Sequence, residues 1–282
     1  MKAFLGIGLL GSNFVKAMLK QGEAVQVWNR THAKALALES EGAKAFENVA
    51  EAVKGATIIH LTLKDDAVVD QVLADAAAGL QPGAIIIDHS TTSAAGAIQR
   101  TKSWKEAGFQ YIHAPVFMGP MNALESTGNM LISGDQELIA QLTPELSKLT
   151  GKLINLGEVT GRAAGIKLIG NLFLISLNAG LVDALTVANG LDIPLTEVIN
   201  LFKDWNPAAS LTGRLEKMTA GKFDVPNWEL SMARKDAGLM MEAASKADQP
   251  LITIPEIAKA MDVLIEDGHG NEDWMVLSQH GK

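Results

Sequence analysis

The sequence lacks cysteine entirely, and its basic residues are in the minority. The absence of cysteine among 282 residues excludes disulfide bonds, thiolate nucleophiles and sulfur-ligated metal sites. It also suits a reducing compartment, so we expect a cytoplasmic protein. The 24 Lys and Arg residues stand against 32 Asp and Glu, for a formal net charge of -8. Because nucleic-acid binding draws its affinity from clustered Lys and Arg, we expect no nucleic-acid partner.

Long uninterrupted apolar runs, internal repeats and low-complexity linkers are missing as well. The longest apolar stretch, residues 168–182, contains Asn171 and Asn178, so we expect a buried helix and no membrane span. Glycines interrupt the apolar start of the chain, which we expect to belong to the mature fold and not to a secretory signal. The composition, 48% apolar and 20% charged, is typical of a globular protein with two domains.

Short apolar runs alternate with helical patterns in the first part of the chain. They predict buried strands at residues 3–7, 24–28, 56–63, 84–88 and 111–116. Strands that are joined by helices pair in parallel through right-handed crossovers, which predicts a doubly wound sheet. Two later runs, residues 128–133 and 152–155, are expected to extend that sheet.

The pattern changes to helical spacing at Gly161 and keeps that spacing through Leu191, which predicts one long helix over residues 161–191. Roughly 30 helical residues would span about 45 Å, enough to join one domain to another. Prolines separate the shorter helices expected after it. We therefore predict an α/β fold in two domains: residues 1–160 with the sheet, and an all-helical domain at residues 161–282.

A glycine-rich turn follows the first predicted strand and opens a helix. It reads Gly6-Ile7-Gly8-Leu9-Leu10-Gly11, and its position between strand and helix indicates a Rossmann dinucleotide-binding site. The first glycine permits the tight turn, the second lets a pyrophosphate approach the backbone, and the third allows close helix packing. The alternative is a glycine turn that binds no ligand.

The end of the second predicted strand bears on the choice of cofactor. An NAD-selective site would place a carboxylate there for the ribose hydroxyl, but the chain has Asn29-Arg30-Thr31. The guanidinium of Arg30 and the two neighbouring polar groups could bind a 2'-phosphate, which favours NADPH/NADP. Alternatively, Asn29 and Thr31 merely turn the chain and cap the next helix.

Two further strand ends carry polar residues, Leu61-Thr62 and Ser90-Thr91, where ligands sit in open α/β sheets. Simple helix capping by Asp65, Asp66 and Ser90 is an equally good interpretation of that region. Three histidines lie near strand ends as well, but their spacing does not suggest a metal site, and we expect a structural role for His60, His89 and His113.

Lys167 and Asn171 lie four residues apart on the predicted long helix, so both side chains emerge on one face. A lysine among apolar neighbours is desolvated, which lowers its pKa toward the range of a general acid. The alternative is a lysine that extends from the apolar surface into solvent.

Four ordered motifs give the chain a resemblance to the β-hydroxyacid dehydrogenase family over nearly its whole length. They are the glycine turn, His113-Ala114-Pro115-Val116, residues 161–171, and Arg234-Lys235-Asp236-Ala237-Gly238-Leu239. The resemblance implies a Rossmann domain followed by an all-helical domain, through which the family commonly forms homodimers. It implies that Lys167 is the catalytic acid/base, that Asn171 holds substrate or lysine, and that Lys235 closes over an NADPH cofactor.

The chain departs from this family in two places. Relatives usually have Ser-Gly-Gly after Ala-Pro-Val, a loop expected to bind a substrate carboxylate, whereas this chain has Phe117-Met118-Gly119. The change suggests a larger or less polar substrate, with Phe117, Met118, Trp205 and Trp228 as candidates for its lining. The glycine pattern before Lys167 also differs, with Gly157 shifted by one residue and Ala163 in place of a glycine.

These motifs predict an NADPH-dependent oxidoreductase that reduces a small aldehyde or keto acid, or oxidises the matching β-hydroxyacid. Hydride would pass from nicotinamide to the carbonyl carbon, while Lys167 protonates the oxygen. Two alternatives stay open. Imine reductases share the architecture and prefer NADPH, but generally lack the lysine at this position. A dinucleotide-binding module without turnover is the other alternative.

Overall fold

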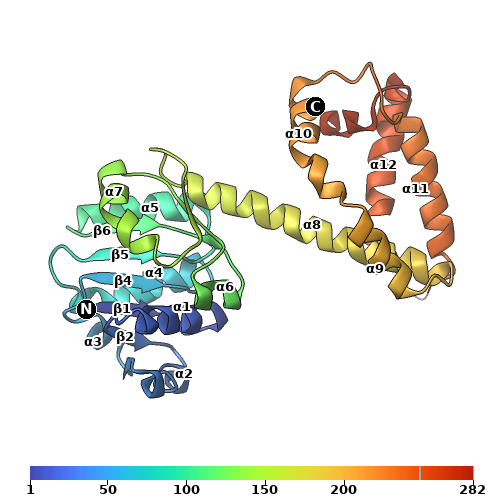
Figure 1. Ribbon diagram of the computed structural model, residues 1–282. Helices are drawn as coiled ribbons and strands as arrows, with labels where there is room; N and C mark the ends of the chain where they lie inside the picture. The colour runs from blue at the N-terminus through green and yellow to red at the C-terminus, as the bar shows by residue number, and fades with distance from the viewer. Residues whose placement is uncertain (248, 282) are drawn as a thin grey trace. The chain divides into compact units, whose positions relative to one another are not determined.

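The computed structural model describes residues 1–247 and 249–281 (Figure 1). The chain divides into two compact units, Met1–Asn171 and Leu172–Lys282, and each is described by itself. The predicted domain boundary after residue 160 lies just before the long helix, whereas the two units divide within that helix.

The first unit is built on a six-stranded parallel sheet in the order β3-β2-β1-β4-β5-β6. This order reverses between β1 and β4, as in a doubly wound dinucleotide-binding fold, and it confirms the predicted fold class. One strand, β3, was not predicted. The strands are β1 (Lys2–Leu5), β2 (Val25–Trp28), β3 (Lys44–Phe46), β4 (Ile58–Leu61), β5 (Ile85–Asp88) and β6 (Gln110–His113).

Both faces of this sheet are apolar, because alternate residues of each strand enter separate cores. Phe4 packs into one core with α1, α2 and α7, while its neighbours Ala3 and Leu5 enter the other with α3, α4 and α5. Burial on both faces favours parallel pairing and explains the near-continuous Val and Ile runs. The helices are α1 (Leu9–Lys20), α2 (His32–Leu36), α3 (Val49–Val53), α4 (Asp66–Ala76), α5 (Ala94–Glu106) and α7 (Gln136–Leu146), with short 3-10 turns at Glu39–Glu41 and Ala77–Gly79.

The prediction that residues 128–133 and 152–155 extend the large sheet is wrong. They form a separate three-stranded sheet of β7 (Val116–Phe117), β8 (Asn129–Ile132) and β9 (Lys152–Asn155). The predicted strand 111–116 is split at Pro115, which has no N-H for the ladder and accepts a hydrogen bond from Leu131 through its carbonyl. The chain thus leaves the edge of the large sheet at this point, and β7 pairs with β8 in antiparallel register. Helix α6 (Pro120–Glu125) lies between them in the chain.

Helix α8 (Arg162–Gly190) agrees with the predicted long helix to within one residue at each end. The prediction that it is buried is wrong for the single chain, since only 6% of its most apolar window is buried. Ile169, Leu172 and Ile175 expose 64%, 67% and 69% of their surface, respectively. No other part of the described chain covers these side chains, although α8 has the apolar composition of a core helix. By length and mean hydropathy, 1.7, α8 is also apolar enough to cross a membrane, a test that core helices pass as well.

The second unit is helical apart from an isolated bridge between Glu229 and Asp273, within the residues described. Its core combines α11 and α12 with the C-terminal turn around Met275 and Val276. Asp273 is fully buried there, where Lys217 and the backbone N-H groups of Asn227 and Met275 donate to its carboxylate. The elements are α9 (Leu195–Asp204), α10 (Leu211–Ala220), α11 (Leu230–Ala244) and α12 (Ile254–Leu264), with shorter turns at Pro207–Ser210, Ile265–His269 and Trp274–Gln279.

Candidate functional site

Two pockets of the first unit meet at the carboxyl ends of the parallel strands. One, of about 620 Å³, extends from the glycine turn to the end of β2 and the start of α4. The other, of about 360 Å³, extends from the same turn to the ends of β5 and β7 and to Lys167. Because both share Gly8, Thr62, Leu63 and Lys64, they form adjoining halves of one elongated site, at the place where open α/β sheets bind ligands.

The glycine turn is held in a conformation that requires glycine at its ends. Gly6 has φ +96°, and a Cβ there would lie 2.2 Å from the carbonyl oxygen of Thr62. A Cβ on Gly11 would lie 2.1 Å from the carbonyl oxygen of Gly6, to which the Thr62 hydroxyl donates a hydrogen bond of 2.9 Å. Strand β1, helix α1 and the loop after β4 therefore approach one another as closely as backbones can.

The middle glycine, Gly8, has a different role because it faces open space. It is the N-cap of α1, no side chain caps the helix there, and a Cβ on it would meet nothing within 4 Å. Free N-H groups and the positive end of the helix dipole are thus available to an anion. A dinucleotide pyrophosphate fits this turn in both shape and charge.

At the end of β2, one polar residue holds the glycine turn and others line the larger pocket. Asn29 accepts a hydrogen bond of 2.9 Å from the N-H of Ile7 and donates one of 3.0 Å to the carbonyl of Thr31, so its amide ties the glycine turn to β2. Thr31 is the N-cap of α2, but its side chain makes no capping bond. Exposed Arg30 and Thr31 line the larger pocket together with Lys34, which sequence reasoning missed.

The ends of β4 and β5 likewise carry residues that line a pocket and residues that hold the fold. Thr62, Ser90 and Thr91 line the smaller pocket, whereas Leu61 is fully buried in the core. Ser90 is not a helix cap, because its hydroxyl accepts a hydrogen bond of 2.8 Å from the N-H of Leu63 and so joins the loops after β4 and β5. Capping is done by Asp65 for α4 and by Ser93 for α5.

The three buried histidines form hydrogen bonds that fix their tautomers. The carbonyl of Ala114 accepts from His89 Nδ1 at 2.8 Å, which leaves Nε2 of His89 to accept from His60 Nδ1 at 3.0 Å. His113 Nε2 donates to the carbonyl of Ser90 at 2.8 Å. The two ring nitrogens without partners are His60 Nε2 and His113 Nδ1, and burial favours the neutral form of each ring. All three rings are therefore neutral.

These histidines make the folded protein sensitive to acid. Burial lowers the pKa of His60 and His113, and it lowers that of His89 to about 4. The unfolded chain takes up protons near pH 6.5 and the folded chain does not, so stability is complete above that pH and is lost as the pH falls toward 4. His89 alone should account for about 2 kcal/mol between pH 7.5 and pH 5.

Urea unfolding at pH 7.5 and pH 5 measures this loss, and an equal free energy of unfolding at both values would contradict it. Carboxylates with a lowered pKa, such as Asp273, stabilise the fold at both of these pH values and lose that effect only as the pH falls below their ordinary pKa of 3.8, so they do not confound the comparison. Among the described residues, no group of His, Asp and Glu is arranged to hold a metal ion. His89 also lines the smaller pocket, which its predicted structural role did not include.

Lys167 enters the smaller pocket from the first turns of α8. Its side chain is only 8% exposed, and burial lowers its pKa. Asn171 follows one turn later on α8 and is half-buried. Val116 and Met118 line the same pocket and add apolar surface to a wall that also carries Thr62, Ser90 and Thr91.

The loop after β7 combines an apolar wall with a local helix cap. Phe117 lies with its ring beneath the Lys167 ammonium, whereas the N-H of Gly119 donates to the Asn122 side chain at 2.9 Å. Gly119 is the N-cap of α6 and therefore has a local structural role, while its contact with a substrate stays a prediction. In the altered glycine segment, Ala163 is buried in the first turn of α8, and its N-H donates to Ser133.

The remaining predicted residues lie away from these two pockets or in the second unit. Ile7 is buried behind the turn. Lys235 belongs to α11 and pairs with Asp236 at 3.0 Å. Trp205 and Trp228 line a pocket of about 900 Å³ within the second unit. Leu63 and Lys64 line both halves of the dinucleotide site and were missed, although they directly follow the predicted strand end at Thr62.

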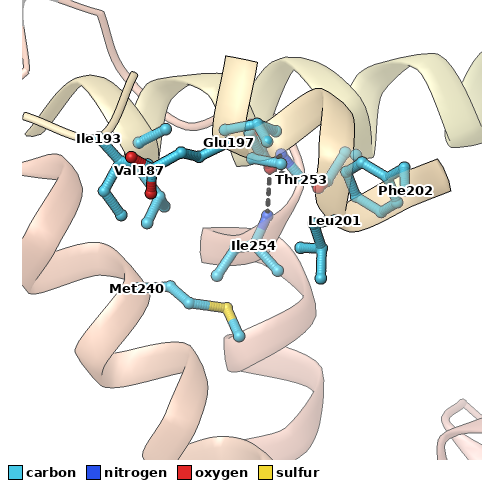
Figure 2. Close-up of a pocket in the computed structure, with 13 residues that line it drawn as sticks. Val187, Ile193, Glu197, Leu201, Phe202, Met240, Thr253 and Ile254 are labelled. Carbon is cyan, nitrogen blue, oxygen red and sulfur yellow. Dashed lines mark hydrogen bonds between the residues drawn. The ribbon is translucent and has the colours of Figure 1, made fainter. Parts of the chain in front are cut away.

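A further pocket of about 490 Å³ lies wholly within the second unit, among α8, α9, α11 and α12 (Figure 2). Its walls are mostly apolar, with Val187, Leu201 and Met240 among them. Burial would raise the pKa of Asp183 in this pocket, but hydrogen bonds from Thr253 and from the backbone N-H groups at the start of α12 lower it. Asp183 therefore caps α12, and the other acidic residue that lines the pocket, Glu197, would repel the phosphates of a dinucleotide.

Comparison with known proteins identifies the family. The model for the NAD binding domain of 6-phosphogluconate dehydrogenase matches residues 2–157, which is more than half of the chain. The chain is 27% identical over 283 residues to 3-sulfolactaldehyde reductase of Escherichia coli (strain K12), across 98% of this chain and 93% of that protein. It is 26% identical over 253 residues to 2-(hydroxymethyl)glutarate dehydrogenase of Eubacterium barkeri, across 88% of this chain and 83% of that protein.

Solved structures share the fold. An imine reductase from Myxococcus stipitatus in complex with NADP+ has a TM-score of 0.92 at 22% identity, over 100% of both chains. A reductive aminase from Aspergillus terreus in complex with NADPH, cyclohexanone and allyl amine has a TM-score of 0.89 at 22% identity, over 100% of this chain and 99% of that one. At this level of identity the likeness concerns the fold alone. The family match agrees with the close backbone packing at Gly6 and Gly11 and the open position at Gly8. The chain belongs to the β-hydroxyacid dehydrogenase family of NAD(P)-dependent oxidoreductases.

Proposed function

We propose that the protein uses NADPH to reduce a small aldehyde or keto acid, or oxidises the matching β-hydroxyacid, with Lys167 as general acid/base. The observation that carries this proposal is one buried lysine in the half of the dinucleotide site that lies beyond the uncapped glycine turn. A lysine that is neither exposed nor used to hold the fold together is a candidate for chemistry.

The chain's own contribution to the reaction would be orientation and proton transfer. The bound nicotinamide supplies the hydride. Lys167 donates a proton to the carbonyl oxygen as negative charge develops there, and its lowered pKa makes that donation easier near neutral pH. Val116 and Met118 keep water away from the lysine, which strengthens the interaction of its charge with the oxygen.

Preference for NADPH over NADH is proposed from the end of β2. Asn29 is occupied by backbone partners, so Arg30, the hydroxyl of Thr31 and the nearby Lys34 are the groups available there for a 2'-phosphate. No carboxylate replaces them at this strand end, where one would repel that phosphate.

Arg30→Ala is expected to weaken NADPH binding by about tenfold to a hundredfold, because it removes a charge-assisted contact of about 1.5–3 kcal/mol. NADH affinity should change by less than about threefold, since NADH carries no 2'-phosphate. Titration of both dinucleotides into the wild type and the variant measures the two constants. An equal loss for both would contradict the assignment of Arg30 to the phosphate.

Substrate choice is proposed from the loop at Phe117 and Met118, where the apolar side chain of Met118 lines the pocket and the family resemblance implies a carboxylate site. The relatives named above are a sulfolactaldehyde reductase and a hydroxymethylglutarate dehydrogenase, so small acidic aldehydes and hydroxyacids are the first compounds to test. A panel of glyoxylate, succinic semialdehyde, 3-sulfolactaldehyde and a cyclic imine, followed by NADPH absorbance, tests the proposal. Turnover of an aldehyde or keto acid above the imine supports it.

Imine reduction is the second candidate, and the apolar Phe117-Met118 wall is the observation that favours it. Lys167 counts against it, because imine reductases generally lack this lysine. Turnover of the cyclic imine alone would replace the first proposal with this one. Dinucleotide binding without consumption on any compound of the panel would instead support a module without turnover.

We also propose a homodimer through the second unit. The exposed apolar residues of α8 and the apolar pocket between α8, α9 and α12 (Figure 2) are surfaces of the kind that a second copy covers. Light scattering should give about twice the chain mass of 29.9 kDa. A monomer at micromolar concentration would contradict the proposal.

A further inference from the structure

The residue that replaces the family's loop serine has a specific neighbour. The ammonium nitrogen of Lys167 lies 4.3 Å from the centroid of the Phe117 ring, on its face. This distance is well within the range of a cation–π interaction, in which the electron-rich face of the ring attracts a cation. Burial lowers the pKa of Lys167. Among the described residues, no carboxylate forms an ion pair with it.

The ring fits there because α8 has a glycine at position 170. A Cβ on Gly170 would lie 2.3 Å from Cζ and 2.7 Å from Cε1 of Phe117, so any larger residue would displace the ring. Lys167 and Gly170 are three residues apart and share a face of the helix. The ring therefore lies in a slot with helix backbone on one side and the lysine ammonium over its face.

The backbone of Phe117 is fixed as well. The residue pairs with Asn129 in the antiparallel ladder of β7 and β8. The turn before β8 contains Gly128 at φ +79°, where a Cβ would lie 2.9 Å from the Phe117 carbonyl oxygen. Strand pairing on one side and the slot at Gly170 on the other leave the ring little freedom.

We propose that Phe117 is a positioning residue, whose ring face holds the Lys167 ammonium in the site in place of a carboxylate or hydrogen-bond partner. Its effect on catalysis rests on the reductase activity proposed above. The attraction favours the charged form of Lys167 and opposes the effect of burial, so the lysine can be desolvated and still carry the proton that it donates. The Phe117 side chain has no hydrogen-bond donor, so it cannot itself fix a substrate carboxylate.

The test must separate the effect of the ring's electron density on Lys167 from the effect of the ring's size and shape. Replacement of Phe117 with 3,4,5-trifluorophenylalanine keeps the size of the ring and withdraws electron density from its face. Lysines labelled with ¹³C at the ε position report their pKa by NMR, and the Lys167 signal is assigned by its loss in Lys167→Met. We expect the fluorinated protein to titrate Lys167 about one pH unit lower than the wild type. The same substitution at Phe109, which packs against Trp104, controls for general effects of fluorination.

An unchanged Lys167 titration in the protein fluorinated at position 117 would overturn the proposal. The measurement needs no turnover, so it stands apart from the proposed function, which fails if no compound of the panel is reduced. In an active enzyme, the alkaline limb of the kcat/KM profile should move down by the same interval, because the acid loses its proton at lower pH.

Gly170→Ala gives a second, independent test. Alanine favours a helix over glycine, so the substitution should not harm α8 itself, but its methyl group should push the ring from beneath the ammonium. We expect Lys167 to titrate at lower pH than in the wild type, with at least a tenfold loss of kcat. Gly165→Ala is the matched control, because a Cβ there would meet nothing within 4 Å. Equal titrations of Lys167 in the two variants would contradict the slot.

Discussion

Lys167→Ala should lower kcat by about a hundredfold to ten-thousandfold, while the affinity for NADPH stays within about threefold of the wild-type value. The lysine is the proposed proton donor, so its loss removes stabilisation that is present only as charge develops on the substrate oxygen. Dinucleotide affinity should survive because the glycine turn and the end of β2 do not depend on Lys167. Steady-state kinetics and a fluorescence titration with NADPH measure the two quantities.

Lys167→Arg is the matched control for this result. Arginine keeps the positive charge and can lie over the Phe117 ring, but its guanidinium does not give up a proton near neutral pH. We expect it to be nearly as inactive as the alanine variant. Full activity in either variant would show that the proton comes from another group and would remove Lys167 from the mechanism.

Alanine substitutions in the glycine turn should affect stability at one position and NADPH binding at another. Gly11→Ala places a methyl group 2.1 Å from the Gly6 carbonyl oxygen and 2.6 Å from the Thr62 hydroxyl. Backbones packed this closely cannot move apart without disrupting β1 and α1, so we expect a loss of about 3 kcal/mol or more of folding free energy. Gly8→Ala meets no protein atom within 4 Å and should cost less than about 1 kcal/mol.

Dinucleotide binding should respond differently from stability: Gly8→Ala, the variant that loses little folding free energy, should lose NADPH affinity. In Gly8→Ala the methyl group occupies the space through which the pyrophosphate approaches the backbone, so NADPH affinity should fall at least tenfold in a stable protein. Thermal unfolding and NADPH titration of both variants check this. Normal binding by Gly8→Ala would show that the pyrophosphate lies elsewhere.

Much of the first unit could be predicted from the sequence because its signals are local. Apolar runs of five to eight residues, separated by helical patterns, are sufficient to predict parallel strands buried on both faces. The glycine turn could be interpreted because each glycine is required by short-range geometry around residues 6–11. Strand β3 was missed because its Lys44-Ala45-Phe46 sequence is short and half-exposed.

The rest depends on contacts that no local pattern records. Residues 128–133 and 152–155 have strand-like sequences, but only the break at Pro115 decides that they form a second sheet. The apolar residues of α8 predict burial without naming what covers them, and in a single chain they are exposed. Asn29 is a polar residue at a strand end, where a ligand contact is expected, but its side chain accepts from Ile7 and holds the glycine turn.

The site near Lys167 shows the same limit most clearly. Phe117 lies 50 residues before Lys167 in the sequence and was assigned to the substrate wall, while Gly170 carried no prediction beyond its place in the helix. The slot that brings the three together is created by the strand pairing of β7 and by the absence of a side chain on α8. A substitution in a family motif can therefore change a lysine's surroundings while the lysine itself is retained.

The central claim, that the protein transfers hydride from NADPH to a carbonyl carbon, is tested most directly by an isotope. NADPH that carries deuterium on the transferred position of nicotinamide C4 is mixed with the protein and the best substrate of the panel. Mass spectrometry of the product should show one deuterium on the carbinol carbon for each NADPH consumed, and Lys167→Ala should form this product far more slowly. Tight binding of NADPH with no deuterium in any product, from carbonyl or imine, would contradict the claim and leave a protein that binds the dinucleotide without using it.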